Sequence, residues 1–505
     1  MSGSADSLVR YSDVVLRADP SRVIARLFVP GHELSMSTES RATGVLSRVL
    51  ALTEKEVAST LADVLARFGK RHRDFSGILE ANYDAIAHRV PHPHSLTLDR
   101  KALIGAWFTH EYSIEAAALF NPSIVRHPDQ RGLEPGHVRF VMSLRAVGEG
   151  HRSSVEFRSG VLGPDQELSL DETVGRVETG RALPPTYERA LFGAKLGEAG
   201  ADEESVRFLL GCLEETFGPI ELEAALVLLL GQRVTRQGGV HTIELAHRIA
   251  DCAYEIEFDA DSRLDERVLW PNSWAESHGI EDVRFVHFVD DDGSSTYVAT
   301  YTAFNGDQIA PQQIATDDFR RFRISQYSGP AATNKGLALF PRKVDGRYLA
   351  LSRWDRENIS IASSIDGETW VDGGVIYRPD LVWELIQTGN CGSPIETEAG
   401  WLVLTHGVGP MREYSIAVIL LDLDDPTKVI AQMRDPLLRP REVEREGYVP
   451  NVAYTCGALL HGDQLVIPYG ASDSAVRFAV VDLPRLLARL QSDGPPATML
   501  TNSAT

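Results

Sequence analysis

The spacing of apolar residues along the chain changes near Trp107. The first forty residues show no clear period, although residues 22–28 could form a strand. From Leu52 onward apolar residues recur every three or four positions, the period of an amphipathic helix. Residues 53–56 form a capping box, and the apolar stripe after it predicts a helix that ends near Gly69. A second stripe, from Asp74 to just before Pro91, predicts another helix. The two predict a helical hairpin.

After Trp107 the pattern becomes short apolar strands, each preceded by a turn that contains glycine. Five such units share a plan, and their turns lie at Gly136, Gly293, Gly346, Gly400 and Gly462. The last three steps between these glycines are about 53, 54 and 62 residues, close to the length of a propeller blade. The chain is therefore expected to be mainly β, as a five-bladed β-propeller. Separate β-hairpins in a sandwich are the alternative.

The first step is far longer, about 157 residues, and its excess lies mainly in residues 183–253. Segments rich in Ala, Leu and Glu predict helices there. They span residues 187–196, 203–217, 220–230 and 243–253. We interpret this region as a helical insertion between blades one and two. The expected division is an N-terminal extension (1–100), the first part of the propeller (101–182), the insertion (183–253), the rest of the propeller (254–490) and a flexible tail (491–505).

Composition narrows the function. The 505 residues are 43% hydrophobic and 24% charged, as in a globular protein, and the length favours two domains or one large fold with insertions. A formal charge of −21 disfavours nucleic acid or an anionic membrane as partner. The four cysteines are scattered without metal-ligand spacing, so no metal site or disulfide is expected. The start of the sequence lacks a signal pattern, and we expect a cytoplasmic protein.

Candidate chemistry lies at the start of the strand 283–289. Glu281 and Asp282 precede it and Arg284 follows them. Consecutive residues of an extended strand point to opposite sides, so only one of the two carboxylates need face a cleft. Either is a candidate general acid; the alternative is a charged pair with Arg284 at a strand end.

In a propeller the ends of corresponding strands converge on one central pocket. The strand-end residues would then face one another: Arg145, Tyr301, Arg353 and His406. In a sandwich they would be solvated strand ends. Several loops rich in glycine and polar residues are typical of a sugar site, for which Trp354, Trp383 and Trp401 are candidate platforms. Packing of these tryptophans between blades is the alternative.

An ordered set of short motifs runs from about Asn121 to Asp473. The motifs are residues 279–284, 300–303, 339–341, 346–348 with Arg353, 393–395, 400–402, 406–408 and 469–473. In this order they resemble glycoside hydrolase family 130, the β-mannoside phosphorylases and related β-mannosidases, which are five-bladed β-propellers. The N-terminal hairpin and the insertion lie outside this resemblance. They are candidates for the acceptor side or for the interface of a homo-oligomer.

The resemblance implies inverting phosphorolysis of β-mannosides to α-mannose 1-phosphate. Among β-mannosides, β-1,2-linked mannooligosaccharides are the leading candidate substrates. Asp282 matches the general acid, which protonates the glycosidic oxygen through a sugar hydroxyl while inorganic phosphate attacks the anomeric carbon. Arg353 and His406 match phosphate ligands, and Arg284 is expected to orient the acid. Substrate-binding residues by this resemblance are Asn121, Arg145, Arg284, Tyr301 and Asp473. No cofactor is expected beyond phosphate as co-substrate, and the partner is a mannose-containing oligosaccharide.

The sequence also departs from the family pattern. Val283 replaces a proline, Arg342 stands where a glutamate is common, Gln387 lies near a lysine of some members, and Asn305-Gly306 replaces an arginine. An inverting β-mannosidase therefore stays open, with Glu149, Glu396 and Glu398 as candidate bases for water. A carbohydrate-binding propeller without catalysis is the third hypothesis.

Overall fold

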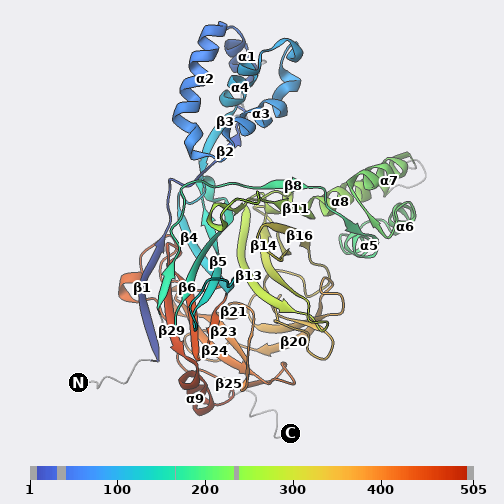
Figure 1. Cartoon of the computed structure of the whole chain (residues 1–505). Coiled ribbons are helices and arrows are strands. Elements are labelled where there is room, and N and C mark those ends of the chain that lie inside the picture. The colour runs from blue at the N-terminus through green and yellow to red at the C-terminus, as the bar shows by residue number, and fades with distance from the viewer. Residues whose placement is uncertain (1–7, 31–40, 165–166, 232–237, 497–505) are drawn as a thin grey trace.

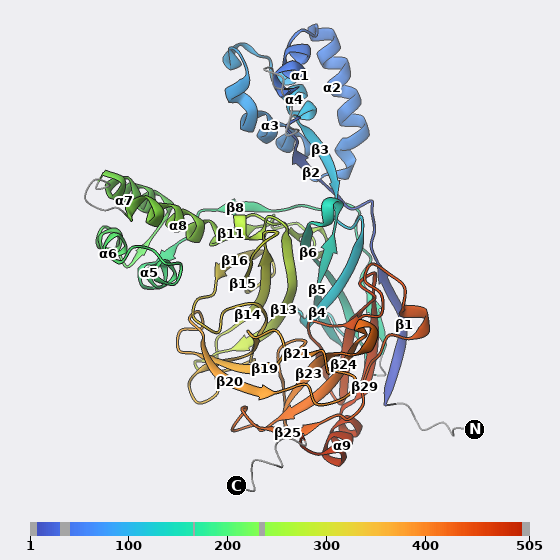
Figure 2. The same cartoon turned by 180° about the vertical axis from the view of Figure 1, so that it is seen from behind.

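The computed structural model describes residues 8–30, 41–164, 167–231 and 238–496. The fold is mainly β, with a helical lobe at one end and a second helical group at the side (Figures 1 and 2). No helix in the described ranges is long and apolar enough to cross a membrane. The predicted tail at 491–505 is described only to residue 496, and the rest of it lies outside the described residues.

The helical lobe is made of four helices and one two-stranded sheet. These elements are α1 (Arg41–Leu50), α2 (Glu54–Phe68), α3 (Phe75–Ile86), α4 (Leu98–Trp107), β2 (Val23–Leu27) and β3 (Thr109–Ser113). The predicted hairpin is confirmed as α2 and α3. The capping box at Thr53 and Glu56 is formed, and Asp74 caps α3. Helix α4 crosses the boundary expected at residue 100 and shares one apolar core with α2 and α3.

Most strands form five antiparallel units, four to five strands each when the partners at their edges are included. The first unit is β4 (Ala118–Arg126), β5 (Val138–Val147) and β6 (Ser153–Leu162), with the short β7 (Leu168–Leu170) and β12 (Val268–Leu269) on β6. The second is β13 (Gly279–Val289), β14 (Ser295–Phe304), β15 (Ile309–Thr316) and β16 (Arg321–Gln326). A parallel pairing of Gly279 in β13 with Ser153 in β6 joins the first two units into one sheet. The third is β17 (Lys335–Leu339), β18 (Tyr348–Arg353), β19 (Ile359–Ser364) and β20 (Val371–Tyr377).

The fourth unit is β21 (Gln387–Asn390), β22 (Ile395–Thr397), β23 (Gly400–Val408), β24 (Tyr414–Leu421) and β25 (Val429–Gln432). The fifth is β26 (Ala453–Tyr454), β27 (Leu459–His461), β28 (Gln464–Ala471) and β29 (Ala475–Asp482). The five strands predicted after glycine turns are β5, β14, β18, β23 and β28. Each lies at the same place in its unit, which confirms the repeated plan.

The first strand of the chain completes the last unit. Strand β1 (Val9–Arg17) pairs antiparallel with β29, so the two ends of the described chain share one sheet. Blue β1 lies beside red β29 in both views (Figures 1 and 2). The expected N-terminal extension is therefore not separate from the β-structure, because its first strand belongs to the fifth unit. Helix α9 (Leu483–Asp493) follows β29 and packs on the same unit.

The helical group at the side confirms the helices expected in residues 183–253. It contains α5 (Arg189–Glu198), α6 (Glu203–Gly211), α7 (Pro219–Gly231) and α8 (Gly239–Asp251), which share an apolar core. Helix α6 ends earlier than expected, because residues 216–217 form β10, which pairs with β9 (Tyr187–Glu188). Strands β8 (Arg181–Leu183) and β11 (Tyr254–Glu257) lead into and out of this group along the edge of the second unit.

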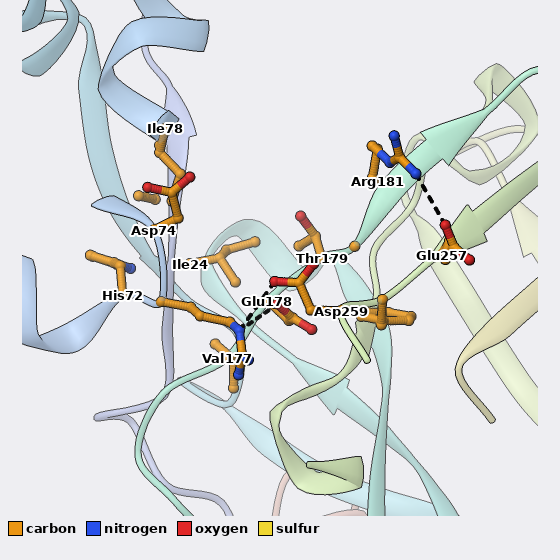
Figure 3. Close-up of a pocket in the computed structure, with 14 residues that line it drawn as sticks. Ile24, His72, Asp74, Ile78, Val177, Glu178, Thr179, Arg181, Glu257 and Asp259 are labelled. Atoms are coloured by element: carbon orange, nitrogen blue, oxygen red, sulfur yellow. Dashed lines mark hydrogen bonds and ion pairs between the residues drawn. The ribbon is translucent and has the colours of Figure 1, made fainter. Parts of the chain in front are cut away.

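Arg73 joins the helical lobe to the β-structure. Its guanidinium lies 3.3 Å from Asp259 and 3.1 Å from Glu266, and it also pairs with Glu178 and Asp261. Beside it lies a cavity of about 320 Å³, lined from the lobe by His72 and Ile78 among others and from the β-structure by Val177, Thr179 and Arg181 among others (Figure 3). The ion pairs of Arg73 fix the lobe at this junction.

Candidate active site

Asp282 lies at an irregularity in strand β13. The register between β13 and β14 shifts between Glu281 and Arg284, and Asp282 has a positive φ of 54°. A bulge of this kind turns a side chain away from the direction that regular alternation would give it. Asn121 lies at a similar register shift in β4, with φ 49°, and donates a 2.6 Å hydrogen bond to Asp282 Oδ1. Two left-handed residues from different units thus meet.

Arg284 holds Asp282 from its own strand. Its Nη1 donates to the Asp282 carbonyl oxygen at 2.8 Å, and its Nη2 lies 3.7 Å from Asp282 Oδ2. The same guanidinium donates to the Cys391 carbonyl oxygen and to the Tyr454 hydroxyl, each at 2.8 Å. The Arg284 side chain is 2% exposed, so it is a fixed internal cation. This geometry fits the orienting role expected for Arg284.

Glu281 also reaches the cluster, although regular strand alternation requires only one of the two carboxylates to face it. It accepts from Arg145 Nη2 at 2.5 Å and from Lys335 Nζ at 2.5 Å. Regular strand alternation breaks at the bulge, and for that reason the two consecutive carboxylates are not separated. With both of its oxygens held by cations, Glu281 neutralises charge around Asp282.

The charges around Asp282 keep it ionised in the free protein. Burial raises its pKa, but Arg284, Lys335, Arg145 and the Asn121 hydrogen bond outweigh burial and lower the pKa to about 2. The side chain still keeps 14% of its surface exposed, so it is accessible to a ligand. A donor role for Asp282 therefore requires that the bound ligands raise this pKa.

Arg353 and His406 meet as predicted. Arg353, at the end of β18, donates from Nη1 to His406 Nε2 on β23 at 2.8 Å. Burial lowers the pKa of His406 well below its usual value, and the charges of Arg353 and Arg284 lower it further. The imidazole is thus neutral, and Arg353 is the charged member of the pair. The charge of Asp282 raises the pKa of His406, so Asp282 lies within electrostatic range of the pair.

Several buried polar atoms in these strands and loops have no hydrogen-bond partner within the described structure. They are Asn121 Oδ1, Arg145 Nε, Arg353 Nε, Asn390 Oδ1 and Ser393 Oγ. Buried polar groups are nearly always paired, so a concentration of unpaired ones indicates partners supplied by ligand or water. The set contains both donors and acceptors, which suits a ligand rich in hydroxyl groups.

Asp473 is a second carboxyl group on which the charge of Asp282 acts. It follows β28 and has a positive φ of 50°. Burial raises the pKa of Asp473 to about 7, Arg145 and Arg412 oppose the rise, and the charge of Asp282 adds to it. Near neutral pH this group changes between a hydrogen-bond donor and an acceptor.

Tyr301 does not join this cluster. Its side chain is 2% exposed, lies in the apolar core of the second unit, and its hydroxyl hydrogen-bonds to Glu276 and to Gln312. Strand alternation points Tyr301 away from the cluster and into that core. Its neighbour Thr300 pairs with Arg284 in the register, and its hydroxyl donates to the Leu337 carbonyl oxygen. The sequence prediction that Tyr301 binds substrate is therefore corrected, because the side chain lies in the core of the second unit.

Two further sets of candidates also lie elsewhere. Glu396 forms an exposed ion pair with Arg342 at 2.7 Å, and Glu149 and Glu398 are exposed, so none of the three proposed bases is held at Asp282. Among the tryptophans, Trp401 is fully buried and Trp383 packs against Gly407, while Trp354 stays 40% exposed. Only Trp354 keeps the exposure that a sugar platform needs.

Sequence reasoning missed two contributors to this site. Lys335 lies beside Gly336 in a polar stretch whose pattern indicates only a loop, and Tyr454 on the short β26 has no local signal. All four cysteines are free, and Cys391 and Cys456 are buried near Arg284. Among the described residues, no group of three or more His, Cys, Asp or Glu side chains could hold a metal ion.

The site combines a carboxylate, fixed cations and unpaired polar atoms, and it is partly exposed. Such a preformed polar site in a mainly β protein is typical of an enzyme. The comparisons define the class further. The glycoside hydrolase family 130 model, described as beta-1,4-mannooligosaccharide phosphorylase, matches residues 243–491. The 1,2-beta-oligomannan phosphorylase of Thermoanaerobacter sp. is 34% identical over 226 residues, covering 44% of this chain and 74% of that protein. The chain belongs to glycoside hydrolase family 130.

Two further comparisons concern Listeria innocua. Its beta-1,2-mannobiose phosphorylase is 33% identical over 239 residues, covering 45% of this chain and 65% of that protein. A solved structure of the beta-1,2-mannobiose phosphorylase from Listeria innocua, in complex with beta-1,2-mannobiose, covers 75% of this chain and 92% of its own, with 23% identity and a TM-score of 0.44.

Proposed function

We propose that the protein cleaves β-mannosidic bonds by phosphorolysis and releases α-mannose 1-phosphate, with β-1,2-linked mannooligosaccharides as the first substrates to test. The observation that carries this proposal is the pairing of an oriented carboxylate, Asp282, with a separate cationic pair, Arg353 and His406. Relatives named as phosphorylases of β-1,2-linked and β-1,4-linked mannosides support the substrate class.

We further propose that the five units are the blades of one propeller, with residues 183–253 inserted between the first and second blades. Site residues come from all five units: Asn121 and Arg145, then Asp282, then Lys335 and Arg353, then His406, then Tyr454 and Asp473. Strand ends that converge on an axis account for this. In this architecture β1 closes the last blade.

In the proposed reaction a phosphate oxygen attacks the anomeric carbon from the face opposite the glycosidic bond. That bond breaks, and a proton passes from Asp282 through a sugar hydroxyl to the leaving oxygen. Inversion follows from a single displacement. Phosphate is already an anion, so no second carboxylate is needed as a base.

Phosphate binding also raises the pKa of Asp282, which carries no proton in the free protein. Its pKa of about 2 leaves it ionised at neutral pH. An anion bound at Arg353 brings negative charge toward Asp282 and competes for the field of the nearby cations, and both effects raise the pKa of a carboxyl group. The acid is then protonated when the nucleophile is in place.

Hydrolysis by the same fold is the second candidate. It requires a carboxylate that activates water. Glu281 is held by two cations, which leaves Asp473, within electrostatic range of Asp282, as the candidate for this role. The cationic pair has no task in that reaction, and we rank it second for that reason.

The test is incubation of the protein with β-1,2-mannobiose, with and without inorganic phosphate, followed by separate measurement of mannose and mannose 1-phosphate. Phosphate-dependent mannose 1-phosphate supports the proposal, and its loss in Asp282→Asn assigns the acid. Equal release of free mannose in both tubes contradicts phosphorolysis. Sugar binding without turnover in the unaltered protein would favour a binding function instead.

A further inference from the structure

Three turns lie where the strands that carry site residues end. Residues 148–152 follow β5, residues 409–413 follow β23, and residues 472–474 follow β28. Arg145, His406 and Asp473 lie in these strands or turns. The turns therefore border the strand ends that carry the candidate site, and we take them as part of its rim.

Two of these turns have the same backbone. Gly148 and Gly409 have φ, ψ of −101°, −161° and −107°, −163°, and the residues two positions later, Gly150 and Met411, have 68°, 18° and 58°, 20°. His151 and Arg412 follow with φ of 60° and 58°.

A left-handed conformation at residues other than glycine costs energy, and such strain gathers at functional sites. In the turn after β23, Met411 and Arg412 adopt it in succession, and Met411 is 88% exposed. The fold thus keeps one unfavourable shape in two separate turns.

The fifth unit contributes an aromatic residue to the same rim. Tyr448 is 41% exposed, its backbone N–H donates to Ser474 Oγ at 2.6 Å, and its hydroxyl lies 2.8 Å from His151 Nδ1. Its ring packs 6.2 Å from the ring of Phe120, the residue before Asn121. Tyr448, in the loop before β26, therefore contacts the first unit at Phe120 and the fifth at Ser474, the chain neighbours of Asn121 and Asp473.

Arg412, in the turn after β23, also acts on Asp473. The charge of Arg412 lowers the pKa of Asp473, as the charge of Arg145 does, so the Arg412 guanidinium is within electrostatic range of that carboxyl group. The turn after β5 thus reaches the segment beside Asp473 through His151 and Tyr448, which bonds to Ser474. The charge of Arg412 acts on Asp473 from the turn after β23.

We propose that Tyr448, held by His151, is a sugar platform on the rim of the site and sets the affinity for the carbohydrate. The inference rests on the proposed function and adds a specificity-determining residue to it. A phenol ring with one side covered and its hydroxyl fixed offers a rigid, half-apolar surface. Pyranose rings stack on such surfaces through their C–H faces while their hydroxyls reach polar groups such as Asp473 and Asn121.

The test compares Tyr448→Ala, Tyr448→Phe and His151→Ala with the unaltered protein. For Tyr448→Ala we expect the KM for β-1,2-mannobiose to rise about tenfold, with kcat and the KM for phosphate changed less than about threefold. Tyr448→Phe keeps the ring and should restore most of the affinity, and His151→Ala should lie between. Trp107→Ala removes a half-exposed tryptophan from the helical lobe and serves as the matched control.

A second measurement separates the platform from the chemistry. Calorimetric titration of β-1,2-mannobiose into Asp282→Asn, with and without Tyr448→Ala, follows sugar binding in the absence of turnover. Weaker binding in the double variant supports the platform even if the reaction proves to be hydrolysis. Unchanged KM and unchanged binding overturn it, as does a loss of kcat with a lower Tm, which indicates only a structural role.

Discussion

At the scale of single residues, the two halves of the proposed reaction are separable. Asp282 with Arg284 and Asn121 forms the acid side, and Arg353 with His406 forms the anion side. The neutral state of His406 leaves Arg353 as the charged group that attracts phosphate. Substitutions at the anion side should therefore affect phosphate more than sugar.

Arg353→Ala tests that separation. A hydrogen bond to a charged group contributes roughly 1.5–3 kcal/mol, so we expect the KM for phosphate to rise at least about tenfold while sugar binding to the variant stays within about threefold. Initial rates at varied phosphate and calorimetric titration of the sugar measure the two effects. Arg347→Ala, an exposed arginine at the far end of the same hairpin, is the control. Equal weakening toward both ligands would contradict the assignment.

Asp473 gives a prediction about pH and stability. Its pKa of about 7 in the folded protein lies above the value of 3.8 for an unperturbed carboxyl group, so protonation favours the folded state. The stabilising contribution is complete below about pH 4 and is lost as pH rises through 7. Asp473→Asn stays neutral, so its Tm should exceed that of the unaltered protein by a few degrees at pH 8, with a smaller gap at pH 4.5. A gap independent of pH would refute the shifted pKa.

At the scale of elements, the bulges decide what the site contains. The helical hairpin was predictable because its signals are local: a capping box, an Asp cap and an apolar stripe. The identity of Asp282, Arg353 and His406 as site candidates was also predictable, because each lies in a short motif. The bulge at Asp282 was not, since a register shift depends on the pairing strand β14. It brought Glu281 into the cluster, and regular alternation left Tyr301 outside it.

Gly389 in β21 gives the prediction at this scale. A Cβ at this position would lie 2.6 Å from His406 Cε1 and 2.9 Å from Arg353 Cδ, and both side chains are confined. Gly389→Ala should therefore displace the anion pair and raise the KM for phosphate about tenfold or more, with little change in Tm. Gly197→Ala in α5, where a Cβ meets no atom within 4 Å, is the matched control. Normal phosphate kinetics in Gly389→Ala would show that the pair moves aside freely.

At the scale of the whole molecule, the N-terminal segment ties the parts together. It supplies β1 to the fifth unit and then Arg22, which enters a buried cluster with Glu115, Glu156 and Arg158. None of this was predictable from the sequence, because the partners lie more than ninety positions away and Arg22 has no local motif. Long-range pairing of this kind becomes visible only in the folded chain.

Arg22→Met tests the importance of the cluster. Arg22 lies 2.9 Å from Glu115 and 2.7 Å from Glu156 and also donates to the Val174 and Asp265 carbonyl oxygens. Removing one partner of a buried ion pair leaves an uncompensated charge, which costs about 3–5 kcal/mol. We expect a clearly lower urea midpoint, with Asp282 and its partners intact in any molecules that remain folded.

The exposed Arg89→Met is the control, because its loss removes a charge of the same kind without opening a buried cluster. Burial raises the pKa of Glu115 to about 8, and repulsion from Glu156 adds to the rise. Without Arg22 both carboxyl groups should bind protons more readily, so the destabilisation should shrink at pH 5 and grow at pH 9. Equal urea midpoints for Arg22→Met and Arg89→Met at every pH would mean that β1 and the lobe are held to the β-structure by their other contacts alone.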